Sequence, residues 1–173
     1  MAFFFYLANI NFFVMKINHL LALLLLITVV SCKKDPEKTP EEIYAERLNG
    51  NWVVSTLNYS ATITVPIIGT IPVNGTANNA GTISFNTPAR TAVYDIRFLP
   101  NISIPGVPID SVEFFGTGTF TNTTSQITVT DSAGTLTFNV VKNEPNFQQV
   151  TTIVNYSLGG QSIPVNLNLS LSR

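Results

Sequence analysis

The chain contains almost no histidine or cysteine. Its 173 residues include one histidine, His19, and one cysteine, Cys32. His19 lies in an apolar N-terminal segment with the composition of a removable leader, and no histidine follows it. Ser-His-Asp and Cys-His catalysis need an imidazole base, and ordinary zinc and iron sites need histidine or cysteine ligands. We therefore expect no enzyme of these classes, no metal site and no cofactor.

Charged residues are also scarce after the N-terminal region. Leu48–Arg173 holds nine of them, five acidic and four basic. Carboxylate catalysis needs a facing pair, but Asp110 and Glu113 are an odd number of positions apart in a predicted strand and point to opposite faces. Asp131 and Glu144 fall in predicted turns. Four basic residues cannot form a nucleic-acid surface. We expect a protein that is not an enzyme and does not bind nucleic acid.

The first 31 residues have the pattern of a secretory signal peptide. Met15-Lys16 supplies positive charge, Leu20–Val30 is the apolar stretch, and Ser31 is the small residue before the predicted cut. The residues before Met15 carry no charge, so we expect translation to start at Met15. The alternative is one long membrane anchor, since about 20 uncharged residues can span a bilayer.

The junction after this leader resembles the lipobox of bacterial lipoproteins. Val29-Val30-Ser31-Cys32 closes the apolar run and Lys33-Lys34-Asp35 opens a polar one. The resemblance implies that Cys32 becomes the first mature residue and carries three acyl chains, palmitate among them. One chain binds membranes only reversibly, whereas several anchor permanently. The two lysines replace the Asp of inner-membrane retention signals, which implies the outer membrane, on its periplasmic face or at the cell surface.

The segment from Cys32 to Arg47 is a predicted tether that leads into a short helix. It holds nine of the eighteen charged residues that follow the leader. Pro40, followed by two glutamates, predicts the helix start, and Gly50 its end. Ile43, Tyr44 and Leu48 form its expected apolar side.

The remaining segment, 48–173, predicts one all-β, antiparallel domain. It is rich in β-branched residues, and apolar and polar residues alternate clearly over Val165–Leu171. Turn signals recur about every 8–12 residues. The pattern predicts nine strands, at about 51–65, 69–77, 81–86, 91–99, 109–120, 125–131, 135–142, 148–157 and 162–172.

Gly50-Asn51-Trp52, at the start of the first strand, resembles the Gly-x-Trp signature of lipocalins. Lipocalin-like lipoproteins of the Bacteroidota share this signature. The resemblance implies an up-and-down, calycin-type β-barrel of eight or nine strands, with Trp52 at its floor and Arg173 lying across it. A two-sheet β-sandwich is the alternative architecture, because meandering strands can form either.

Aromatic residues are the candidate ligand contacts. Phe114, Phe138 and Tyr156 are expected among the walls of a lumen that binds a small apolar or amphipathic molecule; the alternative is that they fill the core. A cavity of several hundred Å³ would favour the ligand, and a filled barrel would favour a structural or protein-binding role.

Two predicted hairpin tips, 66–69 and 102–105, are apolar for loops. Exposed apolar loops can mark contact with a partner. The second functional hypothesis is therefore a surface adhesin, or an accessory subunit of an envelope protein complex, with a filled barrel and no ligand.

Two tripeptides are candidate modification sites. Asp110-Ser111-Val112 and Asp131-Ser132-Ala133 resemble the O-glycosylation pattern of the Bacteroidota, which implies Ser111 and Ser132 as acceptors.

Overall fold

The computed structural model describes residues 36–65, 69–101, 110–158 and 160–173. The described helix and strands all lie in one compact unit, Lys38–Arg173. The predicted signal peptide and Cys32 lie outside the described residues, as do most residues of both apolar hairpin tips.

In the described residues, one helix precedes nine strands. They are α2 (Pro40–Leu48), β1 (Gly50–Val65), β2 (Gly69–Asn78), β3 (Gly81–Asn86), β4 (Thr91–Phe98), β5 (Val112–Asn122), β6 (Gln126–Asp131), β7 (Gly134–Glu144), β8 (Phe147–Leu158) and β9 (Gln161–Ser172). Every predicted strand is present, with bounds close to those expected. In the part of the chain that is described, no helix is long and apolar enough to cross a membrane.

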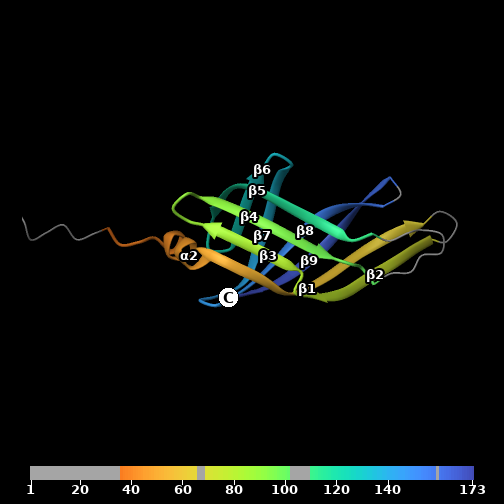
Figure 1. Ribbon diagram of the computed structural model, residues 1–173, viewed down its shortest axis with the longest axis horizontal. Coiled ribbons are helices and arrows are strands. Elements are labelled where there is room, and N and C mark those ends of the chain that lie inside the picture. The colour runs from red at the N-terminus through yellow and green to blue at the C-terminus, as the bar shows by residue number, and fades with distance from the viewer. Residues whose placement is uncertain (1–35, 66–68, 102–109, 159) are drawn as a thin grey trace, which may run out of the picture. The chain divides into compact units, whose positions relative to one another are not determined.

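The sheet closes on itself. Neighbouring strands pair antiparallel in the order β2-β1-β3-β4-β5-β6-β7-β8-β9, and β1 also pairs with β9 over Val53–Ala61 (Figure 1). The result is an eight-stranded up-and-down barrel with one additional strand. The all-β barrel predicted from the sequence is confirmed, and the alternative of a two-sheet sandwich is wrong.

The ninth strand arises because the segment that pairs with one edge of β1 is divided into two strands, β2 and β3. β2 and β3 follow each other along the same edge of β1, and only β3 also pairs with β4. Asn79 separates them with a φ of 54°, a left-handed conformation that asparagine tolerates better than most residues. β2 therefore extends past the closed part of the barrel, and no other described strand pairs with its second edge.

The helix begins at a capping box. The Thr39 hydroxyl accepts a hydrogen bond from the Glu42 amide, and the Glu42 carboxylate accepts one from the Thr39 amide. The helix packs on the barrel through Tyr44, Ala45 and Leu48, which are buried. Ile43 is 42% exposed, so its predicted place on the apolar side is wrong. The small Ala45 faces the barrel in its stead.

Inward side chains fill the closed part of the barrel. Alternate residues along each strand point inward, as the period of two requires. The following have less than 2% of their surface exposed: Trp52, Leu57, Ile83, Ile96, Phe120, Ile127, Phe138, Leu167, Leu169 and Leu171. Small barrels of eight strands are just wide enough for such filling.

The end of the barrel away from α2 is split into three two-stranded ribbons. β1 and β9 pair no further than Ala61 and Val165, so the β1–β2 and β8–β9 ribbons diverge there (Figure 1). β5 extends beyond its last pair with β6, at Thr119, and β8 beyond its last pair with β7, at Thr151. The β4–β5 pair is therefore the third ribbon.

Two prolines protect the free edges of these ribbons. Among the described strands, Pro72 of β2 pairs only with β1, and Pro164 of β9 pairs only with β8. Proline has no amide hydrogen, so it interrupts the row of donors that would recruit a further strand. The edges are therefore poor sites for uncontrolled strand pairing.

Candidate functional site

The floor of the barrel is closed by Trp52 and Arg173. Trp52 is fully buried, and its indole nitrogen donates a hydrogen bond of 2.8 Å to the Leu48 carbonyl at the end of α2. The guanidinium carbon of Arg173 lies 4.5 Å from the centroid of the Trp52 ring, within the range of a cation–π contact. The structure thus brings together the two residues that the sequence pairs.

The Arg173 side chain also joins two separate segments to the end of the chain through its hydrogen bonds. Its Nη1 donates to the Asn49 carbonyl at 2.9 Å, and its Nε and Nη2 donate to the Pro145 carbonyl at 3.1 and 2.7 Å. Asn49 is the C-cap of α2, and Pro145 lies in the turn between β7 and β8. The planar guanidinium suits this arrangement because its donors diverge in fixed directions.

A buried polar network completes the floor. The Tyr44 hydroxyl donates to the side-chain oxygen of Gln148 at 3.3 Å, and the Gln148 amide donates to Asn143 and to the Glu144 carbonyl. Burial raises the pKa of Tyr44, so its hydroxyl keeps the proton that it donates. Gln148 is fully buried with its amide satisfied, so this network helps to dock α2 on the barrel.

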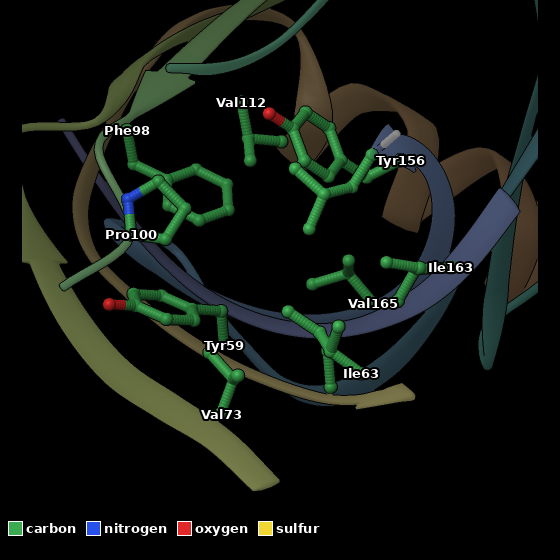
Figure 2. A pocket seen from close by; sticks show the side chains of 11 residues that line it. Tyr59, Ile63, Val73, Phe98, Pro100, Val112, Tyr156, Ile163 and Val165 are labelled. Carbon is green, nitrogen blue, oxygen red and sulfur yellow. The ribbon is translucent and has the colours of Figure 1, made fainter. Parts of the chain in front are cut away.

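At the opposite end, apolar side chains from all three ribbons surround a small hollow (Figure 2). Its lining residues are Tyr59, Ala61, Ile63, Val73, Phe98, Pro100, Val112, Tyr156, Leu158, Ile163 and Val165. The hollow has a volume of about 20 Å³. That is space for about one water molecule, far below the roughly 300–1,000 Å³ of small-molecule pockets. This hollow, as the described residues form it, is therefore too small for a ligand.

The three aromatic residues predicted to line a ligand site lie in three different environments. Phe138 is 1% exposed and is part of the filled barrel. Tyr156 lines the hollow, where its hydroxyl lies 3.5 Å from the Asp110 carbonyl. Phe114 lines a separate recess. The structure does not bring them together around one cavity.

That recess lies beside the turn between β6 and β7 and has a volume of about 140 Å³. Tyr94 and Phe114 contribute aromatic walls, with ring centroids 6.4 Å apart. The Tyr94 hydroxyl donates to the Asp131 carboxylate at 2.5 Å. Gly116 makes room for this bond, since a Cβ there would lie 2.4 Å from the carboxylate oxygen. Sequence reasoning placed Asp131 in a turn but missed its partner, which is 37 residues away.

Hydrogen bonding changes the proton affinities of both partners. The bond from Tyr94 lowers the pKa of Asp131, helped by the amides of Ala133 and Gly134, which donate to the same carboxylate. Desolvation, followed by the bond and charge of Asp131, raises the pKa of Tyr94 to about 12. The pair is therefore a hydroxyl and a carboxylate at neutral pH. It fastens the β6–β7 turn to β4.

The predicted modification sites are accessible where they are described. Ser111 and Ser132 are both exposed, and the Ser111 hydroxyl donates to Glu113 at 2.9 Å. Their glycosylation stays a prediction, as does the lipidation of Cys32.

No protein-family model matches the chain, and no curated protein matches it. Among solved structures, the chain is similar to a redesigned beta barrel at 16% sequence identity and a TM-score of 0.34. The match covers 75% of this chain and 94% of that chain. The architecture of the present barrel rests on its own strand pairing.

Replacing Arg173 with alanine should lower the free energy of unfolding by about 1–2 kcal/mol, because it removes the cation–π contact and the hydrogen bonds to two carbonyls. Arg173→Lys keeps the charge but lacks the planar guanidinium, so its free energy of unfolding should lie between those of Arg173→Ala and the parent. Chemical denaturation followed by Trp52 fluorescence measures the effect. Equal stability of Arg173→Ala and the parent would contradict the role given to this residue.

Replacing Asp131 with asparagine should reduce the acid sensitivity of the fold. Because folding lowers the pKa of Asp131, its carboxylate contributes stability above its usual pKa, and this is lost as pH falls through the folded-state value. Unfolding free energies from about pH 5 to about pH 2 should therefore fall less in Asp131→Asn than in the parent. Tyr94→Phe, which keeps the carboxylate but removes its donor, should lie between them. Identical pH profiles would refute this.

Proposed function

We propose that this chain is a lipid-anchored protein of a bacterial outer membrane that binds through the outside of its barrel, as an adhesin or an accessory subunit of an envelope complex. The filled interior carries this proposal. Its hollow of about 20 Å³ is lined by side chains and closed below by packed core, so the barrel works as a rigid scaffold. Anchoring by Cys32 rests on the lipobox resemblance.

The outer surface offers a contact for a protein partner on β4 and β5. Val93 and Phe115 point outward there with 49% and 66% of their surfaces exposed. Their strands are paired, with Asp95 opposite Phe115 and Thr117 opposite Val93, so the two apolar side chains are diagonal neighbours. Arg97 forms an ion pair of 2.9 Å with Asp95 beside them. An apolar pair rimmed by charge is typical of a protein contact.

A second candidate function is binding of a small apolar or amphipathic molecule between the ribbons. The observation that favours it is the splitting of the barrel at this end. The ribbons meet through side chains, including the Tyr59 hydroxyl, which accepts a hydrogen bond of 2.8 Å from the Asn101 amide. They could separate without breaking strand pairing, which would enlarge the apolar hollow. This candidate comes second because the hollow between the ribbons is only about 20 Å³.

Lipid anchoring predicts that Cys32→Ser abolishes membrane attachment, because serine offers no thiol for acylation. Cells expressing the full chain would be fed an alkyne-tagged palmitate and fractionated. The parent should carry the label and sediment with membranes, and the variant should do neither. A labelled Cys32→Ser chain, or an unlabelled parent, would disprove the anchor.

A packed barrel predicts that the Lys33–Arg173 chain purifies without a small molecule. Native mass spectrometry should give the mass of the polypeptide alone. Ile163→Trp, which fills the hollow, is the matched control and should also have only its own mass. If the parent carries an apolar molecule that Ile163→Trp lacks, the second candidate is correct and the first is wrong.

A further inference from the structure

A polar groove crosses the outer face of the barrel over β7, β8, β9 and β1. Its volume is about 390 Å³, within the usual range of small-molecule sites. Its lining residues are Asn58, Tyr59, Ser60, Asn139, Thr151, Thr152, Ile153, Asn166, Leu167 and Asn168. We call it the amide groove, since four of these residues are asparagines.

Three of the four asparagines belong to one continuous row across paired strands. The row, in order from β6 to β2, is Gln126, Asn139, Thr151, Asn168, Asn58 and Thr76. Residues directly opposite each other in a sheet point to the same face, and here that face is the outside of the barrel. The row therefore presents closely spaced polar groups from six strands.

Hydrogen bonds within the sheet orient three of the side-chain amides. The oxygen of Asn58 accepts from the Thr76 hydroxyl at 2.7 Å, and that of Asn139 accepts from the Gln126 amide at 3.2 Å. The oxygen of Asn168 accepts from Gln149 at 3.0 Å. Each amide has two further donors on nitrogen, and none of these three nitrogens donates to another described residue. The groove is thus lined by side-chain amides whose orientation is fixed by their oxygens and whose nitrogens can donate to a ligand.

The groove also lacks charge and contains an apolar contact. None of its lining residues is an acid, a lysine, an arginine or a histidine, in contrast to the outer face of β4 and β5, where Asp95 and Arg97 lie. A charged ligand would find no opposite charge. Ile153 is 61% exposed and offers an apolar surface inside the groove. A ligand that suits this groove has hydroxyl and ether oxygens to accept from the asparagine amides and a carbon–hydrogen face to contact Ile153. A sugar has both.

We propose that the amide groove binds a neutral oligosaccharide. This inference rests on the proposed function, since it names the ligand of an outward-binding scaffold. The ring oxygens and hydroxyls of the sugar accept hydrogen bonds from Asn58, Asn139 and Asn168. The Ser60 and Thr151 hydroxyls on the same face add groups that both donate and accept.

The test is an array of immobilised neutral and acidic oligosaccharides probed with the full chain in a zwitterionic detergent, which has no sugar head group. The parent should bind neutral members of the array. A double variant, Asn139→Ala with Asn168→Ala, should bind them at least about tenfold more weakly, because two hydrogen bonds are lost. Asn155→Ala, on the same outward face of β8 but outside the groove, should bind like the parent.

Thermal unfolding of all three chains checks that the variants are folded, and Thr151→Ala provides a second groove variant if the double variant is not. Binding to no oligosaccharide, binding to acidic ones only, or equal binding by a folded groove variant would overturn the inference. Failure here leaves the outward-binding function intact, because that function is tested separately by the native mass of the Lys33–Arg173 chain.

Discussion

The pairing of the first strand with the last is the constraint on which the rest of the structure depends. Val53–Ala61 of β1 pairs with Val165–Ser172 of β9, which converts a meander into a closed barrel. Over this paired length, closure removes the sheet edges that would otherwise recruit other chains, and it confines the inward side chains to a space they fill. A filled interior is therefore a consequence of closing eight strands around large aliphatic and aromatic residues.

The two ends of the barrel are closed by different contacts. Because side chains occupy both, the proposed binding surface lies on the outside of the barrel. At one end, Arg173 holds the C-cap of α2, the β7–β8 turn and the Trp52 ring in one set of contacts. At the other, the strands separate into ribbons whose apolar side chains meet around a hollow of about 20 Å³. As the described residues form it, that hollow is too small for a ligand, whereas the outer face has a larger, polar concavity.

Sequence reasoning succeeded where the signal is local and failed where two strands must be brought into register. The strands followed from alternation and turn residues, and the helix start from Pro40. The separation of Phe114 from Tyr156, the Tyr94–Asp131 bond and the row of asparagines were not predictable. Each depends on which residues lie opposite one another across strands that are distant in the chain. Alternation predicts the face of the sheet on which a residue lies, but not its neighbour on the next strand.

The sequence by itself determined that Leu48–Arg173 is an all-β domain whose strands alternate between core and surface, with no histidine after His19 for catalysis. It also singled out Trp52 and Arg173, because their positions at the two ends of the domain resemble a known floor. The tertiary structure alone decided that the sheet closes, that the interior is full, and that amides from β7, β9 and β1 share a groove. These outcomes depend on register and side-chain volume summed over all the strands, and no single segment specifies either.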